Sequence, residues 1–416
     1  MEFIKERHKY KSDGEINLPK NIQIINNIFD ENGYKLYLVG GTVRDFLDNK
    51  KPKDFDVATN ATPQEVIDIL IKRFGIKYKK GQDYILKNKW RVNHMSKSFG
   101  VIVIFIPGEK EGIDIASFNT RHDGNIILKD VKLEDDAKRR DITFNALYYD
   151  ITNKEIIDLV GGVNDLKSRN LNMVGDPSER IQEDPLRIQR LFRFGCKYNS
   201  LMNKDTKEAI HKNKELYRKP TPERPNGVSQ ERIIEEFIKS FNSIKDFTKY
   251  LDYLNEFKMW QILFPGISFE TFDISNYKQT NKLSICLAQI LINESSDIFK
   301  SVMVNKWQFS RRILQKVSLL VELLRTNKPK DMVNLKMRQV RFNISNNIIK
   351  EFIDIMDLKS NIIMKFLKFN PEVDSKEIMD ENNIDHENGK IKNPIVDGRK
   401  LGILISKKRL DNFNSL

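Results

Sequence analysis

The stretch "LVGGTVRDFLDNKKPKDFDVATNATP", Leu38–Pro63, places two glycines after a short apolar run and two aspartates one residue apart. The apolar run Leu36–Val39 predicts a buried strand, and Gly40 and Gly41 end it where a backbone turns tightly or approaches a ligand closely. Thr42–Leu47 then predicts the first turns of a helix. Because the amides at a helix start attract anions, this turn is a candidate anion-binding site.

The two aspartates predict a cation site. Asp54 and Asp56 flank Phe55, and on a strand both carboxylates would lie on one face. Like charges that close repel each other unless a cation lies between them, and carboxylates together with phosphates hold Mg²⁺. Asp114, in the apolar stretch "GIDIASF", is a third acid on a predicted strand. The alternatives are a solvated loop for the first two acids and an exposed edge-strand acid for Asp114.

The order of these motifs resembles the nucleotidyltransferase domain of the DNA polymerase β superfamily. More closely, the chain is similar to the family of class II tRNA nucleotidyltransferases and bacterial poly(A) polymerases. "KRRDITFNALYYD" (Lys138–Asp150) resembles the Arg-Arg-Asp-x-x-x-Asn motif of that family, and "EDPLRIQRLFRF" (Glu183–Phe194) resembles its Glu-Asp-x-x-Arg motif. "SQERIIEEF" (Ser229–Phe237) looks like the helix that follows. The likeness is dense from about Leu36 to Phe237.

The resemblance implies a two-metal reaction. Asp54 and Asp56, with Asp114 as helper, would hold two Mg²⁺ ions; one lowers the pKa of an RNA 3′-hydroxyl and the other neutralises the triphosphate as pyrophosphate leaves. The resemblance also implies that the ribose and phosphates of the nucleotide are bound by Gly40, Gly41, Arg44, Arg140, Asp141 and Asn145. For the last three residues the alternative is a salt-bridged helix start.

Asp184 and Arg187 are candidates for choosing the base. On a helix, residues three apart share a face, and this pair offers acceptors and donors to the edge of a base. The resemblance implies that the pair acts as an amino-acid template for cytosine and adenine. Alternatively, Asp184 before Pro185 is a helix N-cap that Arg187 pairs with. Arg190 and Arg193 continue the stripe toward a triphosphate, although any half-buried helix shows the same alternation.

Composition favours a polyanionic partner, which the resemblance implies is tRNA. The 416-residue chain has a formal net charge of +13 and a pI near 9.3, although a basic surface also serves solubility. Its two cysteines, Cys196 and Cys286, are too few for a disulfide scaffold or a zinc site, which favours a reducing compartment. No stretch is apolar for long enough to span a bilayer, and the N-terminus lacks a signal peptide pattern. We therefore expect a cytoplasmic protein that does not contact membranes.

Helix and strand signals divide the chain. Thr62 and Glu65 predict a capping box, and the run Val101–Ile106 predicts a fully buried strand. From Glu183 onward strand signals almost vanish, while amphipathic helices continue, for example the one that Ser310 caps. The predicted class is α+β, with a small polymerase β-like sheet and helices followed by an all-helical body. We expect four segments: a loose N-terminal segment (1–20), a catalytic head (21–150), a helical nucleotide-recognition neck (151–240) and a helical RNA-binding body (241–416).

The product is open between CCA addition, with CTP and ATP, and poly(A) synthesis or A-addition. "SFGVIVI" (Ser98–Ile104), "PIVDGRKLGI" (Pro394–Ile403) and the lack of a long Arg-rich tail favour CCA addition by resemblance. A long, basic insertion at Phe74–Phe99 and a short segment at Thr120–Asp136, where CCA-adding enzymes carry a flexible loop, favour the alternative. A non-catalytic RNA-binding protein is a third hypothesis, which the intact motif residues disfavour.

Overall fold

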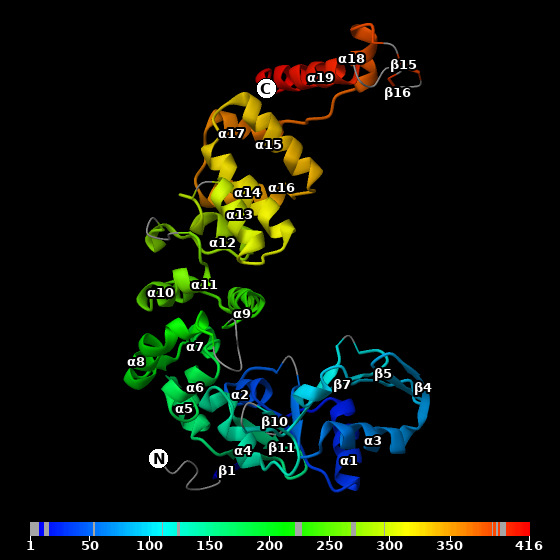
Figure 1. The fold of residues 1–416 in the computed structure, drawn as a ribbon, viewed down its shortest axis with the longest axis vertical. Helices are drawn as coiled ribbons and strands as arrows, with labels where there is room; N and C mark the ends of the chain where they lie inside the picture. The colour runs from blue at the N-terminus through cyan, green and yellow to red at the C-terminus, as the bar shows by residue number, and fades with distance from the viewer. Residues whose placement is uncertain are drawn as a thin grey trace. The chain divides into compact units, whose positions relative to one another are not determined.

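The structure is a computed structural model that describes residues 8–11, 16–52, 55–109, 111–122, 125–220, 227–267, 272–294, 296–384, 386–387, 390–391 and 397–416. The chain groups into two compact units, residues 1–228 and 229–416, and Figure 1 traces it from blue at the N-terminus to red at the C-terminus. The first unit combines sheet and helices, and the described part of the second is helical apart from one short hairpin. The predicted α+β class is therefore confirmed. The finer division at residues 20, 150 and 240 stays a prediction.

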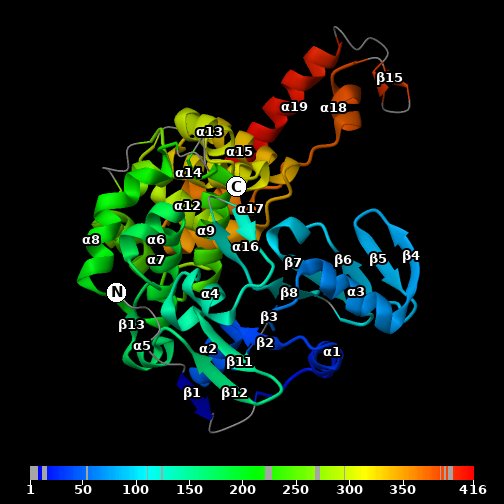
Figure 2. The same ribbon diagram turned by 60° about the horizontal axis from the view of Figure 1, so that its bottom comes forward.

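A ten-stranded sheet organises the first unit (Figure 2), in the order β1-β12-β11-β2-β3-β8-β7-β6-β5-β4. Neighbouring strands run antiparallel except β3 and β8, which are parallel. The strands are β1 (His8–Lys11), β2 (Leu36–Val39), β3 (Val57–Thr59), β4 (Ile76–Lys80), β5 (Asp83–Leu86), β6 (Arg91–Asn93), β7 (Val101–Phe105), β8 (Ile113–Ser117), β11 (Leu147–Asp150) and β12 (Glu155–Asp158).

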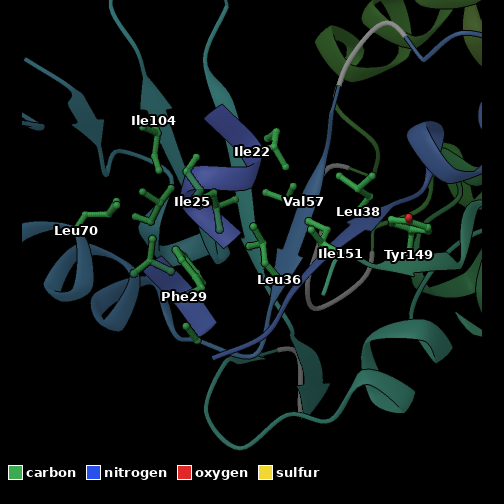
Figure 3. Packing of buried hydrophobic residues seen from close by; sticks show 14 of the residues in the cluster. Ile22, Ile25, Phe29, Leu36, Leu38, Val57, Leu70, Ile104, Tyr149 and Ile151 are labelled. Carbon is green, nitrogen blue, oxygen red and sulfur yellow. The ribbon is translucent and has the colours of Figure 1, made fainter. Parts of the chain in front are cut away.

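One side of this sheet, here called the α1/α3 face, is apolar. Leu38, Val57, Ile104 and Ile115 of the strands are at most 1% exposed, and they form one cluster with Phe29 and other residues of the helices. Figure 3 shows side chains of α1 and α3 packed against those of the strands. The two helices are α1 (Lys20–Glu31) and α3 (Pro63–Phe74).

The other side, here called the α4 face, has a smaller apolar cluster. Tyr37, Ala58 and Tyr148 of the strands pack there against Leu133 and Ala137 of a helix. The remaining helices of the unit are α2 (Gly41–Leu47), α4 (Leu133–Lys138), α5 (Gly162–Ser168), α6 (Pro177–Glu183), α7 (Arg187–Tyr198) and α8 (Lys204–Asn213).

Local signals at the start of the unit behave as predicted. Strand β2 ends directly before Gly40, and helix α2 begins at Gly41. The capping box forms at α3: the Thr62 side chain accepts the Glu65 amide, Glu65 returns to the Thr62 amide, and Pro63 occupies the first helical position. These contacts stabilise the helix start that follows the aspartate segment.

Three expectations are corrected. Residues 8–11 are not loose, because they form β1 and pair with β12, whose outer edge would otherwise lack a strand partner. Strand β7 is not fully buried: its residues alternate between half-buried and buried, because only one face is covered by the core. The strand predicted over the aspartate segment is shorter, since β3 begins at Val57.

The basic insertion at 74–99 becomes sheet. It supplies β4, β5 and β6, which continue the sheet beyond β7 and end it at β4, whose five residues are all exposed. The long insertion expected from the sequence thus contains three strands. This part of the sheet is here called the sheet extension.

The second unit consists of α9 (Gln230–Ser243), α10 (Thr248–Glu256), α11 (Trp260–Leu263), α12 (Leu283–Ile290), α13 (Ser296–Asn305), α14 (Arg311–Arg325), α15 (Pro329–Arg341), α16 (Asn346–Ile355), α17 (Asn361–Lys368), α18 (Ser375–Glu381) and α19 (Asp397–Asn414), with a hairpin of β15 (His386–Glu387) and β16 (Lys390–Ile391). Ser310 caps α14 as predicted. Across the described residues, none of the helices has the length and apolar character that crossing a bilayer requires.

Candidate active site

The glycine turn joins β2 to α2 beside two arginines. Gly40 has φ 57° and ψ −114°, a conformation that favours glycine, and α2 begins at the next residue. A Cβ atom at Gly40 would lie 3.6 Å from Arg140 Nη1, and one at Gly41 would lie 3.5 Å from Arg44 Nη2. Gly40 is therefore needed for its dihedral angles, and the turn lies directly against two guanidinium groups.

The parallel pairing of β3 with β8 places two of the predicted acids side by side. Val57 lies opposite Ile115, so Asp56 and Asp114, which precede them, are neighbours at the same ends of the strands. Because Val57 and Ile115 belong to the α1/α3 face, strand alternation puts both aspartates on the α4 face. Both side chains are exposed. Asp54 lies outside the described residues.

The donors suit a hard divalent cation. Among the described residues, which exclude Asp54, no group of three or more His, Cys, Asp or Glu side chains converges. Partial desolvation raises the pKa of the Asp114 carboxyl above its usual value. A nearby cation would stabilise the carboxylate in that setting, and carboxylate oxygens are the ligands that Mg²⁺ prefers. Asp56 and Asp114 thus fit the metal that the sequence predicts.

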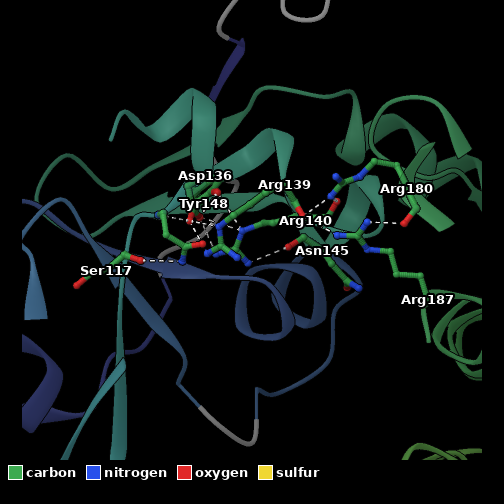
Figure 4. A network of polar contacts seen from close by, with 9 residues as sticks. Ser117, Asp136, Arg139, Arg140, Asn145, Tyr148, Arg180 and Arg187 are labelled. Atoms are coloured by element: carbon green, nitrogen blue, oxygen red, sulfur yellow. Dashed lines mark hydrogen bonds and ion pairs between the residues drawn. The ribbon is translucent and has the colours of Figure 1, made fainter. Parts of the chain in front are cut away.

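Arg140 is held beside the glycine turn by a buried carboxylate (Figure 4). Asp136 of α4 is 1% exposed, and its Oδ2 atom lies 3.1 Å from Arg140 Nη2. Arg140 Nε donates to the Tyr148 hydroxyl at 2.9 Å, and that hydroxyl donates to Asp136 Oδ2 at 2.7 Å. Arg139 Nε donates to Asp136 Oδ1 at 2.8 Å. One carboxylate therefore orients two arginines.

Charge pairing outweighs burial in this network. Burial alone would raise the pKa of Asp136, but Arg140 and Arg139 bring it below the usual range. Burial alone would lower the pKa of Arg140, but Tyr148 and Asp136 raise it. Burial also raises the pKa of Tyr148, so its hydroxyl stays neutral and can donate. The network is consequently fixed in one charge state across neutral pH.

A second chain of contacts joins four predicted nucleotide-binding residues. Arg190 Nε donates to Asp141 Oδ2 at 2.6 Å, and Asn145 Nδ2 donates to Asp141 Oδ1 at 3.4 Å. Arg44 Nη1 in turn donates to Asn145 Oδ1. Burial would raise the pKa of Asp141, but Arg190 lowers it to about 2. The chain connects α2, the segment after α4 and the first turn of α7.

Arg44 ties α2 to the end of α7. Its Nη2 atom lies 2.9 Å from Asp45 Oδ1, and the Tyr198 hydroxyl donates to the same oxygen at 2.9 Å. The Arg44 guanidinium carbon is 4.5 Å from the centre of the Tyr198 ring and 5.5 Å from that of Phe194. Arg193, further along α7, lies 4.2 Å from the Phe194 ring. Arg44 therefore has a packing role in addition to any contact with a nucleotide.

Asp184 and Arg187 do not share a helical face. Helix α6 ends before Asp184, which is extended, and α7 begins at Arg187. The Asp184 carboxylate accepts the Leu186 amide at 3.4 Å, while Arg187 Nη1 lies 2.7 Å from Glu183 Oε2. The expected helical spacing is wrong because the chain breaks between α6 and α7 at Pro185. The alternative, in which Arg187 pairs with Asp184 as a helix cap, predicted another partner. Arg187 pairs with Glu183.

Three arginines gather at this break. Arg187 Nη2 donates to the Arg139 carbonyl at 3.2 Å, and Arg180, 7% exposed, donates to the carbonyls of Arg139 and Arg140. Glu183 pairs with both Arg180 and Arg187. Burial and the charge of Arg187 lower the pKa of Arg180, and its buried Nε has no hydrogen-bond partner within the described part of the chain. The arginine cluster, Arg139, Arg180 and Arg187, is only partly neutralised, because Glu183 is shared by Arg180 and Arg187 while Asp136 is shared by Arg139 and Arg140.

Sequence reasoning missed the residues that hold the predicted ones. Asp136 precedes Arg140 by four positions on a helical run, a spacing typical of an ion pair, and could have been proposed. Arg180 and Tyr148 gave no such signal, because their partners are distant in the chain. These supporting contacts depend on the tertiary fold.

Comparison with known proteins gives a consistent result. Residues 36–172 match the model of the poly A polymerase head domain. The chain is 32% identical over 280 residues to poly(A) polymerase I of Salmonella typhi, which covers 66% of this chain and 55% of that protein. It is 30% identical over 293 residues to the CCA-adding enzyme of Ligilactobacillus salivarius, which covers 64% of this chain and 67% of that protein. The chain thus spans about half the length of the poly(A) polymerases it matches.

The fold is also that of solved structures. The Bacillus stearothermophilus CCA-adding enzyme in complex with CTP has a TM-score of 0.66 at 20% identity, over 95% of this chain and all of that chain. A CCA-adding enzyme in complex with ATP has a TM-score of 0.58 at 17% identity, over 95% of this chain and 93% of that chain.

Proposed function

We infer that this chain, which belongs to the family of class II tRNA nucleotidyltransferases and bacterial poly(A) polymerases, is a template-independent enzyme that extends the 3′ end of an RNA. The RNA 3′ oxygen bonds to the α-phosphorus of a nucleoside triphosphate, the bond from that phosphorus to the bridging oxygen breaks, and pyrophosphate leaves. Two Mg²⁺ ions bound by Asp54, Asp56 and Asp114 would supply the positive charge that favours both events.

The observation that carries this proposal is the contact between the acid pair and the glycine turn. The Val39 amide donates to the Asp56 carbonyl at 3.0 Å, so Asp56 lies beside the residue that precedes Gly40. Arg140 lies over Gly40 from the α4 face. A triphosphate seated here would have carboxylates for its metal ions on one side and a fixed guanidinium on the other. Preorganised charge of this kind is what phosphoryl transfer requires.

Asp184 and the arginine cluster would select the base. Arg187 presents a planar donor fork and Asp184 presents acceptors, and both belong to the break between α6 and α7. The surplus positive charge and the unsatisfied Arg180 Nε favour an anionic or acceptor-rich ligand at this place. The chain Arg190–Asp141–Asn145 would transmit the position of α7 to the phosphate site. Arg193, on the same helix, would contribute to the field around the triphosphate.

CCA addition with CTP and ATP to tRNA is the preferred product. It is supported by a CCA-adding relative of which the chain spans two thirds and by likeness of fold to CCA-adding enzymes over 95% of this chain. Poly(A) synthesis or A-addition is the alternative, supported by similarity to poly(A) polymerases over 66% of the chain. Both reactions use the same site, so only the products distinguish them.

Incubation of the full chain with Mg²⁺, a tRNA transcript lacking its last three nucleotides and labelled CTP or ATP tests the proposal. CCA addition predicts a single product three nucleotides longer that requires both triphosphates. A long ladder from ATP alone would favour the polymerase alternative. Absence of incorporation from any triphosphate would refute the enzymatic proposal and leave an RNA-binding protein.

A further inference from the structure

The sheet extension has one open face. Residues of β6 and β7 alternate strictly between half-buried and buried, and the buried ones, Val92, Ile102 and Ile104, belong to the apolar cluster of the α1/α3 face. The half-buried ones therefore lie on the opposite side, which is the side of the α4 face. The strands of the extension are seen beside α3 in Figure 2.

The strand pairing shows that this open face continues as far as the acid pair. Tyr78 lies opposite Ile85, Ile85 opposite Arg91, and Arg91 opposite Phe105, so the four side chains form one row across the strands. In the next row Val103 lies opposite Asp114. Since directly opposed residues point to the same side, the row and the proposed metal ligand Asp114 share one surface.

The row borders a basic hollow. A depression of about 480 Å³ is lined by Lys77, Tyr78, Ile85, Lys89, Arg91 and Phe105, among others. The one carboxylate lining it, Glu109, accepts a hydrogen bond from Asn21 at 2.8 Å. Arg91 is paired with Asp83, which leaves Lys77 and Lys89 against this one carboxylate, so the hollow suits an anion.

The aromatic side chains of the hollow suit nucleic-acid bases. Tyr78 is 49% exposed. The Arg91 guanidinium lies 3.6 Å from the centre of the Phe105 ring and 3.3 Å from Asp83, so it is already held flat and in place. Exposed aromatic rings interleaved with cations are the features by which proteins bind single-stranded nucleic acid, through stacking and phosphate contacts.

The distance across the strands from β8 to β4 also fits a short single strand of RNA. Four strand spacings separate β8 from β4, about 19 Å at roughly 4.8 Å each. Roughly six stacked nucleotides at about 3.4 Å each would cover it. We propose that the open face of the sheet extension binds the single-stranded 3′ segment of the RNA behind the nucleotide being extended. The proposal rests on the proposed function, since that function places an RNA 3′ end at Asp114.

Binding of a fluorescein-labelled single-stranded 12-nucleotide RNA to the full chain, in EDTA without triphosphate, tests the proposal by anisotropy. Tyr78→Ala should weaken binding at least fivefold, because one stacked base is lost. Lys77→Glu should also weaken it at least fivefold. The matched control is Lys79→Glu, because Lys79 lies on the opposite face of the same strand, 5.0 Å from the Tyr84 ring, and changes net charge equally.

Three outcomes would overturn the proposal. Tyr78→Ala could bind the single strand as tightly as wild type, or the two Lys→Glu variants could weaken its binding equally. Tyr78→Ala could also weaken binding of a blunt 12-base-pair RNA duplex as much as it weakens binding of the single strand. The binding assay is independent of catalysis. If wild type extends RNA but Tyr78→Ala binds normally, the inference fails and the proposed function stands. If wild type adds no nucleotide but the variants bind RNA less tightly as expected, the surface stands and the proposed enzyme activity fails.

Discussion

On the α1/α3 face the sheet contributes Leu38, Ile104 and Ile115, which are fully buried, whereas on the α4 face Asp114 of β8 and Asp56, which directly precedes β3, are exposed. The difference arises from strand alternation, which sends adjacent residues to opposite sides. Burial on the first face stabilises the fold, while the second keeps polar groups in water and available to ligands. Substitutions one residue apart should therefore affect different properties, and the predictions below test that separation.

The largest effect is expected from Asp56→Ala. Loss of a metal ligand should reduce nucleotide addition by more than about 100-fold, since even residues behind a ligand commonly contribute 10- to 100-fold. The melting temperature should hardly change, because removal of one of two neighbouring carboxylates relieves repulsion. Single-turnover incorporation and thermal melting measure the two quantities. Asp54→Ala should behave in the same way.

Asp68→Ala is the matched control for these variants, because Asp68 is an exposed acid on α3 that accepts a hydrogen bond from Gln64 and lies outside the proposed site. It should retain wild-type activity. Near-normal incorporation by Asp56→Ala with Mg²⁺ present would remove Asp56 from the proposed metal site.

Ile115→Ala should instead lower the free energy of unfolding of the first unit by about 2–5 kcal/mol, because it opens a cavity in the apolar cluster. Ile115→Val should cost only about 0.5–1.5 kcal/mol. Urea-induced unfolding gives both values. Activity per folded molecule should stay close to that of wild type, although Asp114 is the adjacent residue. A large loss of activity at full folding would show that the two faces are not separable here.

Asp141 is a polar residue for which we predict an effect on stability. Its pKa is about 2 in the fold and about 3.9 in an unfolded chain, so the ionised form is favoured by folding. The resulting stabilisation, about 2–3 kcal/mol, is complete above pH 5 and is lost as the pH falls toward 2. The free energy of unfolding should therefore decrease more steeply between pH 5 and 3 in wild type than in Asp141→Asn. Parallel curves would contradict the ion pair with Arg190.

The smallest effect concerns base choice. Asp184→Asn exchanges an acceptor for a donor and should change the preference between CTP and ATP by about tenfold, since an unpaired buried group costs roughly 1 to 3 kcal/mol. Arg187→Lys should act similarly, because the planar fork is lost while the charge remains. Single-nucleotide incorporation with each of the four triphosphates measures this, and melting controls for folding. Unaltered selectivity in both variants would argue for a purely structural role of the break between α6 and α7.

Local patterns predicted the elements around the glycine turn well. Strand β2, helix α2 and the capping box at Thr62 depend on residues within a few positions of one another, so the sequence contains their full cause. The placement of Asp114 on a strand was likewise correct. The alternation in β7 was not foreseen, because its apolar run gave no sign that one face would stay open.

Contacts between distant segments could not be predicted. Arg190 pairs with Asp141, and Arg180 binds the carbonyls of Arg139 and Arg140, through the packing of α6 and α7 against the segment after α4. The sequence identified several of these residues as candidates but not their partners. The break at Pro185, which removes the assumed helical spacing of Asp184 and Arg187, has instead a local cause, because the residue before a proline is disfavoured in a helix.

The parallel pairing of β3 with β8 also explains how this molecule could gain an insertion without displacing Asp56 and Asp114 from each other. The whole sheet extension lies in the connection between these two strands, and their pairing fixes the position of Asp56 relative to Asp114 whatever the connection contains. Doubling the length of a flexible connection costs only about 0.6 kcal/mol of chain entropy. Evolution could therefore lengthen, decorate or trim this crossover as an almost independent module, and variation among relatives should be concentrated there.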